Sequence, residues 1–321
     1  MITITKEDLQ SQAKARGYRA EILEKVIRLL NLLEQLNTVP YLRERLVLKG
    51  GTAINLFCTN HLPRLSVDLD FNYVGAVERS VMQQERNQVE SIILDVCSRL
   101  RYELHRHPGS AHAGGKMVLE YQSLLGNKGR LEIDMNYMFR IPLWGSTLES
   151  SADWPKATQT AVINKHELAA GKLHALLGRK ASRDLFDSHQ LLTKWSLDST
   201  KLRTAFTVYA GMESESWQTL TVDKVDFTVK DIRDRLLPVL KRTEAPDTSS
   251  KAIKLWADRL MDECKTRLAS VLPFQPQEIE FLDRIQKHGE IRPDLICIDD
   301  ALCARISRHP SLLWRVERRG K

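Results

Sequence analysis

Two aspartates two residues apart, Asp68 and Asp70, form the part of this sequence best suited to chemistry. They lie in the stretch R-L-S-V-D-L-D-F-N-Y, in which polar and apolar residues alternate. Successive side chains of a β-strand point to opposite faces, so the pattern predicts a strand over Leu65–Tyr73 with both carboxylates on one face, together with Arg64 and Ser66. Carboxylates this close repel each other unless a cation lies between them. Mg²⁺ is the usual cation, because it binds carboxylates together with the phosphates of a substrate.

A glycine pair precedes this strand. The segment V-L-K-G-G-T-A-I-N-L-F places Lys49, Gly50, Gly51 and Thr52 after a short apolar run and before residues with helical spacing. Glycine allows the backbone to approach a ligand closely, and the free amides at the start of a helix bind phosphate oxygens. The motif therefore predicts a phosphate-binding turn next to the carboxylate strand.

A second alternating stretch, R-L-E-I-D-M-N-Y-M, contains Glu132 and Asp134 on one strand face. If this strand paired with the first, a third carboxylate would join Asp68 and Asp70. Three carboxylates around two Mg²⁺ ions suit an in-line attack on a phosphate, in which one ion activates the attacking hydroxyl and the other neutralises the leaving pyrophosphate. The alternation by itself leaves open whether Glu132 or Asp134 completes the set.

The pattern changes to helices from about residue 164. The sequence predicts an α+β fold in which residues 1–160 form a lobe with a mixed sheet and helices, and residues 161–321 form a mainly helical lobe. In the helical lobe, Lys172 lies in an apolar stripe. Its neighbours three and four positions away are Leu168, Ala169, Ala175 and Leu176. A lysine in such a place either extends to solvent or reaches a buried anion.

Arg183, Asp184 and Asp187 form a charged group shortly after this helix. They are consistent with an ion-pair cluster at the start of a helix, with Ser182 as its N-cap, or with a catalytic role. The sequence alone favours neither interpretation.

Composition narrows the class of protein. The chain of 321 residues has a net charge of +7, which is compatible with a polyanionic partner. It has no apolar run of about 18 residues and no signal-peptide pattern at its start, so neither a membrane span nor secretion is expected. Its five cysteines are scattered, which predicts neither a disulfide framework nor a zinc site. We expect a cytoplasmic protein.

These motifs resemble those of a known family. The glycine turn and D-x-D strand of polymerase-β-type nucleotidyltransferases are similar to two stretches of this chain, K-G-G-T-A-I-N-L-F and, after a spacer, R-L-S-V-D-L-D-F. More narrowly, the chain resembles the AbiEii/AbiGii-type toxins of bacterial toxin–antitoxin and abortive-infection systems. Three further stretches support the narrower match: D-M-N-Y-M-F-R-I-P-L, E-L-A-A-G-K-L-H-A-L-L-G-R-K-A-S-R-D-L-F-D and H-P-S-L-L-W-R. The resemblance therefore spans most of the chain.

The resemblance implies a nucleotidyltransferase-fold lobe and a helical lobe that completes the active-site cleft. It also implies a role for each motif. Asp68, Asp70 and Asp134, rather than Glu132, are expected to bind two Mg²⁺ ions, and Lys172 is expected to be catalytic as well. The residues expected to bind the nucleotide are Lys49, Gly50, Gly51, Thr52, Ser66, Lys172, Arg183, Asp184 and Asp187.

The function implied by the resemblance is that of a toxin that transfers a nucleoside monophosphate from an NTP to an RNA acceptor. The leading acceptor is the 3′ end of tRNA, whose modification would block translation and growth. A cognate antitoxin is the expected protein partner. Two alternatives remain: nucleotidylation of a protein or small-molecule hydroxyl, and a catalytically silent NTP-binding protein that acts by interaction.

Overall fold

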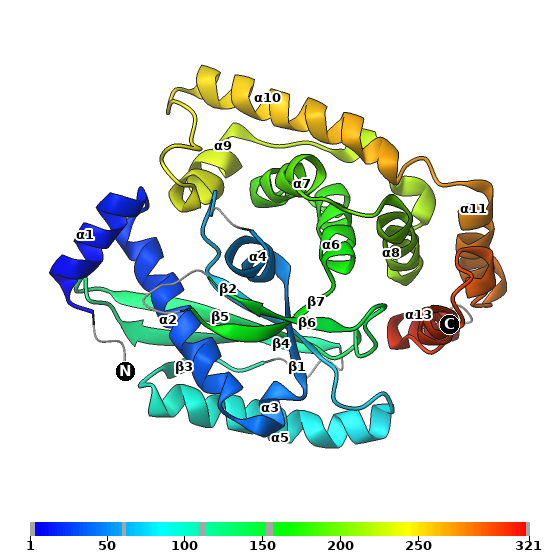
Figure 1. Cartoon of the computed structure of the whole chain (residues 1–321), viewed down its shortest axis with the longest axis horizontal. Coiled ribbons are helices and arrows are strands. Elements are labelled where there is room, and N and C mark those ends of the chain that lie inside the picture. Colours follow the sequence, from blue (N-terminus) through cyan, green and yellow to red (C-terminus); the bar gives the residue numbers. More distant parts are fainter. Residues whose placement is uncertain (1–3, 60–61, 109–112, 152–156, 319–321) are drawn as a thin grey trace. The chain divides into compact units, whose positions relative to one another are not determined.

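The computed structural model describes residues 4–59, 62–108, 113–151 and 157–318. The chain forms two compact units (Figure 1). The sheet unit comprises Met1–Arg140, Ser146–Ile163 and Pro238–Ala245, and the helical unit comprises Ile141–Gly145, Asn164–Leu237 and Pro246–Lys321. Each unit therefore includes a short segment from the other half of the chain. The expected α+β class is confirmed.

Within the described residues, the sheet unit contains seven strands in the order β3-β4-β5-β2-β1-β7-β6. The sheet is mixed, because β2 runs parallel to β5 but antiparallel to β1, which in turn runs parallel to β7. The strands are β1, Leu46–Lys49; β2, Asp68–Tyr73; β3, Glu103–Arg106; β4, Gly114–Gln122; β5, Lys128–Asn136; β6, Ser146–Ser150; and β7, Gln159–Ile163.

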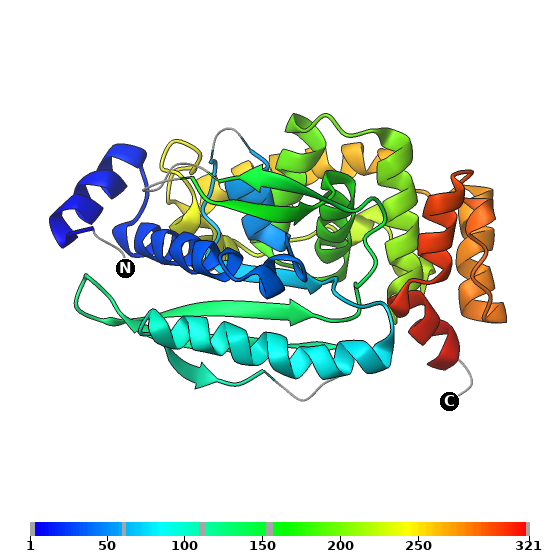
Figure 2. The same cartoon turned by 60° about the horizontal axis from the view of Figure 1, so that its bottom comes forward.

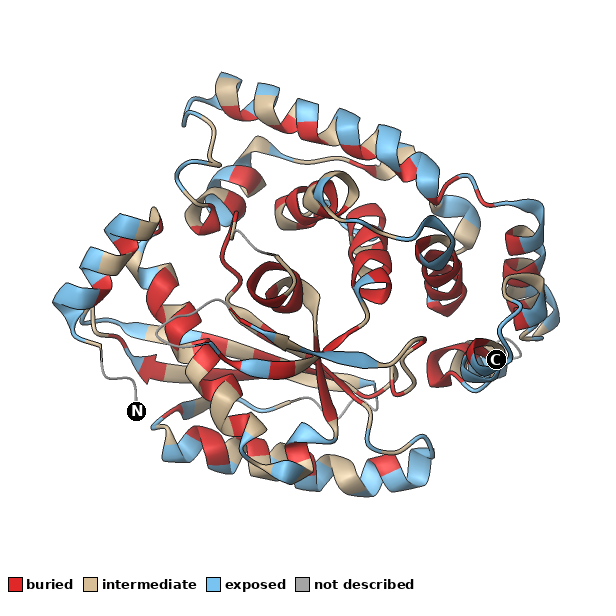
Figure 3. Cartoon of the chain, viewed as in Figure 1, coloured by how far each residue is buried: buried red, intermediate tan, exposed pale blue. Residues whose placement is uncertain are grey.

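Helices α2 and α5 cover one face of this sheet (Figure 2). The apolar residues of α2 recur every three or four positions, so they form one stripe that is buried against the sheet (Figure 3). The helices of the sheet unit are α1, Lys6–Arg16; α2, Ala20–Asn37; α3, Pro40–Arg43; α4, Gly50–Thr52; and α5, Arg79–Arg99.

Helix α5 also fixes β2 and β5 from this face. The hydroxyl of Tyr73, at the end of β2, donates to Glu85 of α5. The hydroxyl of Tyr137, just after β5, donates to Glu90 of α5 at 3.2 Å. Because side chains alternate along a strand, Asp68 and Asp70 point to the opposite face, away from α5.

The helical unit is built around α6, which packs on α7 and α8 and has apolar side chains buried on most sides. Shorter turns of π- and 3₁₀-helix link the remaining helices. The helices of this unit are α6, Lys165–Gly178; α7, Ser182–Lys194; α8, Ser199–Met212; α9, Val229–Asp231; α10, Ser250–Arg267; α11, Pro276–Asp283; α12, Asp300–Ser307; and α13, Pro310–Glu317.

The structure corrects the extent of the carboxylate strand. The strand expected from Leu65 begins only at Asp68. The residues before it pair instead with the segment Pro238–Ala245: the amide of Leu65 donates to Val239 O at 2.8 Å, and Arg64 forms an isolated bridge with Leu240. The alternation before Asp68 therefore reflects pairing with a distant segment, which no local pattern could reveal.

Several elements were missed because they lack a periodic pattern. Helix α8 is buried along nearly its whole second half, so it has no polar face to define a helical period. Strand β6 is polar and mostly exposed, so it lacks the apolar alternation of a half-buried strand.

The sulfur atoms of Cys297 and Cys303 are paired, which the scattered cysteines did not suggest.

Candidate active site

The glycine turn lies directly over the carboxylate strand. Lys49 ends β1, and Gly50 follows with a φ of +71°, in the left-handed region that favours glycine. A Cβ atom at Gly50 would lie 2.2 Å from Oδ2 of Asp70. Gly50 therefore has two functions: it allows the turn, and it brings the backbone against the Asp70 carboxylate.

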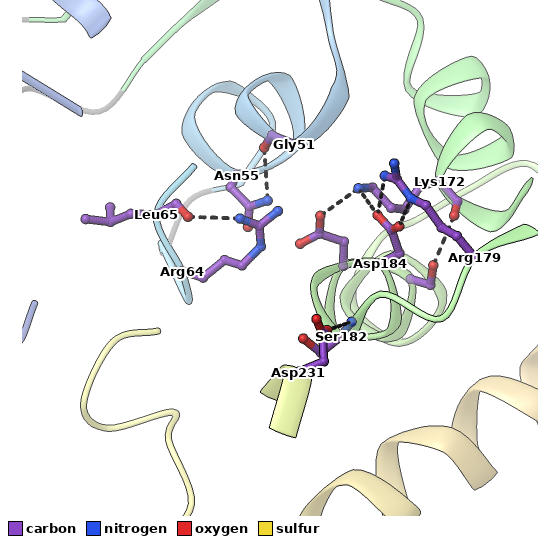
Figure 4. A network of polar contacts seen from close by, with 11 residues as sticks. Gly51, Asn55, Arg64, Leu65, Lys172, Arg179, Ser182, Asp184 and Asp231 are labelled. Atoms are coloured by element: carbon purple, nitrogen blue, oxygen red, sulfur yellow. Dashed lines mark hydrogen bonds and ion pairs between the residues drawn. The ribbon is translucent and has the colours of Figure 1, made fainter. Parts of the chain in front are cut away.

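Two hydrogen bonds hold the turn in place. The hydroxyl of Thr52 donates to the main-chain oxygen of Asp68, which joins α4 to the start of β2. The side-chain amide of Asn55 donates to Gly51 O at 3.0 Å (Figure 4). Thr52 and Asn55 are both buried, so these bonds are shielded from water and fix the backbone close to the two aspartates.

Four charged residues form a row across four adjacent strands. Lys49 of β1 is paired in register with Asp70 of β2, Asp70 with Asp134 of β5, and Asp134 with Lys116 of β4. Residues paired in register share a sheet face, and their Cβ atoms lie about 5 Å apart. From β1 to β4, the row therefore consists of a cation, two anions and a second cation. Asp68 lies two residues before Asp70, on the same face of β2, and is paired with Glu132.

The environments of Glu132 and Asp134 differ. The pKa of Asp134 is raised, first by partial burial and then by the neighbouring Asp70 carboxylate, although Lys49 and Lys116 oppose the shift. Glu132 accepts a hydrogen bond from Lys116 Nζ at 2.6 Å. Glu132 thus has a cation as its direct partner, whereas Asp134 is crowded against another acid.

The donor set fits a divalent cation. Asp68, Asp70 and Asp134 supply the oxygen ligands that Mg²⁺ prefers, and the repulsion between Asp70 and Asp134 is relieved when a cation binds. In the part of the chain that the structure describes, no three His, Cys, Asp or Glu side chains already converge as a metal centre. An ion would therefore have to draw these carboxylates together.

The close contact at Gly50 gives a first prediction. Gly50→Ala should lower the free energy of unfolding by at least about 1–2 kcal/mol, because alanine is strained at this φ, and should slow the nucleotidyl transfer that the sequence resemblance implies about tenfold or more by displacing Asp70. Chemical denaturation and initial transfer rates measure the two effects.

Gly126→Ala is the matched control. Gly126 also has a positive φ, of +96°, but nothing lies within 4 Å of the position its Cβ would take. This variant should share the backbone strain and keep the wild-type rate. Equal rates in the two variants would show that the contact between Gly50 and Asp70 does not matter for catalysis.

The helical unit contains a second charged group, centred on Lys172 of α6. Its Nζ lies 2.8 Å from Oδ1 of Asp184 and 3.0 Å from Oδ2 of Asp187, both on α7 (Figure 4). All three side chains are at least nine-tenths buried. Of the two possibilities left open for this lysine, it therefore reaches buried anions rather than extending to solvent.

An arginine completes this group. Nε of Arg179 lies 2.6 Å from Oδ2 of Asp184. Burial acts to raise the pKa of Asp184, but Lys172 and Arg179 outweigh it and hold the pKa below its ordinary value. Asp184 therefore stays ionised between two cations, and the group keeps a fixed geometry within the helical unit.

The other predicted site residues have simpler surroundings. Ser66 is buried just before β2, outside the strand in which it was expected. Arg183 lies on α7 and is half-buried, while Arg179 pairs with Asp184. The interpretation of this group as a helix-start cluster made Ser182 the N-cap, but Ala181 occupies that position. The amide of Ser182 instead donates to Asp231 Oδ2 at 2.7 Å.

Sequence reasoning missed two charged residues of these groups, Lys116 and Arg179. Lys116 begins an apolar stretch, and only the register of β4 with β5 reveals that it neighbours Asp134. Arg179 follows the end of α6, and the short turn between α6 and α7 brings it to Asp184, five residues further along the chain. The available signal for Lys116 was its place at the start of an apolar stretch that shortly precedes the acidic strand in the sequence.

Comparison with known proteins identifies the family of the chain. A family model for the nucleotidyl transferase AbiEii toxin of type IV toxin–antitoxin systems matches residues 31–269, well over half of the chain. Among solved structures, the chain is similar to MenT4, a nucleotidyltransferase toxin from Mycobacterium tuberculosis H37Rv. The TM-score is 0.65 at 19% identity, covering 94% of this chain and 99% of that one, a likeness that shows the fold. A comparison with curated proteins gives no match.

The chain belongs to the AbiEii family of nucleotidyltransferase toxins, and it is a nucleotidyltransferase. The resemblance stated from its motifs is thereby confirmed. Membership in a toxin–antitoxin family implies an NTP substrate and a cognate antitoxin. Searching the described ranges for a helix long and apolar enough to cross a membrane finds none.

Proposed function

We propose that this toxin transfers a nucleoside monophosphate from an NTP to an RNA, at the 3′ end of tRNA, in a reaction that depends on Mg²⁺. The observation that carries the proposal is the pairing of Asp70 with Asp134 beneath the Gly50 turn. Two adjacent carboxylates next to backbone that approaches this closely suit the binding of metal-complexed phosphates.

Asp68, Asp70 and Asp134 are the proposed ligands of two Mg²⁺ ions. When bound, these ions would neutralise phosphate charge and lower the pKa of the attacking hydroxyl. The protein's own part is to hold the reactants in line. We assign the triphosphate to the turn residues Lys49, Gly50, Gly51 and Thr52 together with Ser66, because backbone amides and a lysine at this position can bind phosphate oxygens.

In the helical unit, we assign Lys172 and Arg183 to the nucleotide, with Asp184 and Asp187 positioning the lysine. Lys172 has one positive charge, whereas Asp184 and Asp187 together have two negative charges. Its contact with phosphate is proposed to add to its ion pairs rather than to replace them, because replacement would take a cation away from two buried carboxylates.

The third carboxylate is assigned by contrast. Asp134→Asn should reduce transfer as severely as loss of Asp68 or Asp70, whereas Glu132→Gln should be milder because Glu132 is occupied by Lys116. Initial rates of both variants test the assignment. An inactive Glu132→Gln variant together with an active Asp134→Asn variant would instead assign Glu132 as the third carboxylate.

Stability gives an independent readout of Asp134. Because its pKa is raised in the folded protein, the folded state binds this proton more tightly than the unfolded chain does. The free energy of unfolding therefore falls as the pH rises through the raised pKa. Without metal, Asp134→Asn should melt above wild type at pH 7, and the difference should vanish near about pH 3, where the Asp134 carboxyl is protonated in the folded and the unfolded protein alike. Equal melting temperatures at pH 7 would contradict this.

An RNA acceptor is proposed because of the net positive charge of the chain. Digestion of the labelled products with RNase or protease tests it. A net charge of +7 favours a polyanion, whose bound counterions are released on binding. The toxin is incubated with MgCl₂, cell lysate and each of the four NTPs labelled at the α-phosphate. Label that RNase removes and protease leaves supports RNA. Label that only protease removes identifies a protein acceptor, and label in neither polymer identifies a small molecule.

A further inference from the structure

The second lysine of the charged row, Lys116, has no role in the reaction described so far. It is paired in register with Asp134 on the side away from Asp70 and the glycine turn. Its Nζ binds Glu132, but 41% of the Lys116 side chain and 37% of that of Glu132 remain exposed. A pair this exposed is screened by water and contributes little to stability. Lys116 can therefore exchange Glu132 for a stronger anion.

The order of the row indicates which anion that is. In an in-line displacement, the attacking and leaving oxygens lie on opposite sides of the phosphorus atom. Under the proposed function, the pyrophosphate leaves on the side of the glycine turn, next to Lys49 and β1. The acceptor then enters from the opposite side of the carboxylates, which is the side of β4 and Lys116.

We propose that Lys116 binds the phosphodiester backbone of the RNA acceptor next to its reacting 3′ hydroxyl. A lysine suits this role because it is a flexible point charge, and a contact with backbone phosphate positions the RNA without reading its sequence. The inference rests on the proposed function and adds a subsite for the acceptor to it.

The test uses the full-length toxin with total tRNA, saturating NTP and fixed MgCl₂, over a range of salt concentrations. Lys116→Gln should raise the KM for tRNA about tenfold, as expected for the loss of one charged hydrogen bond. The slope of log KM against log salt should fall by about one, because one phosphate is no longer neutralised. The KM for NTP should not change.

Lys128→Gln is the matched control. Lys128 lies on the same hairpin, is ion-paired with Glu120 at 3.2 Å, and starts β5 at the end away from Asp134. The control removes the same charge from an exposed ion pair, so its KM and salt slope should equal those of wild type. An equal effect of both lysines would show that only net charge matters, and would overturn the proposal.

A double variant separates contact with RNA from local charge balance. If Lys116 serves only to neutralise Glu132, then Lys116→Gln/Glu132→Gln should restore the wild-type KM for tRNA. If Lys116 binds RNA, the KM should stay elevated in the double variant, and Lys116→Arg should recover part of the affinity. Restoration in the double variant, or an unchanged KM in Lys116→Gln, would overturn the inference while wild-type transfer to RNA still stands. Absence of transfer to RNA by wild type would instead refute the proposed function.

Discussion

Asp70→Asn should reduce nucleotidyl transfer by at least about 100-fold, and Asp68→Asn should do the same. An amide preserves the shape of the side chain but supplies no anionic oxygen for a hard cation such as Mg²⁺. Stabilisation of charge by a bound metal contributes several kcal/mol to the transition state, and each 1.4 kcal/mol changes the rate about tenfold. Initial rates at saturating NTP and MgCl₂ give the comparison with wild type.

The melting temperature of these two variants is the control, because it shows whether they are still folded. Both should melt cooperatively at or above the wild-type temperature without metal, because removing either carboxylate relieves repulsion among Asp68, Asp70 and Asp134. Near-wild-type transfer by either well-folded variant would rule out a metal site built on the D-x-D strand.

Lys172→Ala should have the largest effect on stability, with a loss of about 3–5 kcal/mol in the free energy of unfolding. Removing the lysine takes one ion pair from the completely buried carboxylate of Asp187 and part of the charge compensation from Asp184. A buried carboxylate that loses a cation keeps its cost of dehydration with less to offset it. Urea unfolding followed by circular dichroism measures the loss.

Lys180→Ala provides the comparison for this loss. Lys180 also forms an ion pair in the helical unit, with Asp226, but both side chains are well exposed. Its replacement should cost less than about 1 kcal/mol. Lys172→Ala/Asp187→Asn should recover part of the stability lost in Lys172→Ala, since it removes the buried anion together with its partner. Equal stability of the two single lysine variants would show that the buried cluster is unimportant.

The same set of variants tests the catalytic assignment of Lys172. A loss of activity in Lys172→Ala alone has two explanations, local unfolding and loss of a phosphate contact. The double variant with the partly restored fold separates them. If it still has a raised KM for NTP or a severely reduced rate, Lys172 acts on the nucleotide, whereas wild-type kinetics would leave it a structural role.

Local patterns were sufficient to predict the first contact of the candidate site, between the glycine turn and the D-x-D strand. Alternation identifies Asp68 and Asp70 as neighbours on one strand face, and a glycine pair after an apolar run identifies the turn at Gly50. The structure places these elements in contact. Such motifs are readable because each depends only on residues adjacent in the sequence.

Pairing between distant segments was not readable in this way. The neighbours of Asp134, which are Asp70 on one side and Lys116 on the other, follow from the register of three strands, of which β2 lies far from β4 and β5 in the sequence. The apolar stripe around Lys172 predicted burial or extension to solvent, but its partners depend on the packing of α6 on α7. Register and helix packing therefore set the limit of prediction from a single sequence.

Labelling at different phosphates tests the central claim most directly. RNA is incubated with the toxin, MgCl₂ and NTP radiolabelled at either the α- or the γ-phosphate. Nucleotidyl transfer supported by the carboxylate row predicts that RNA acquires only the α-label and that EDTA or Asp70→Asn abolishes the transfer. Acquisition of the γ-label, or α-labelling that survives both EDTA and Asp70→Asn, would contradict it.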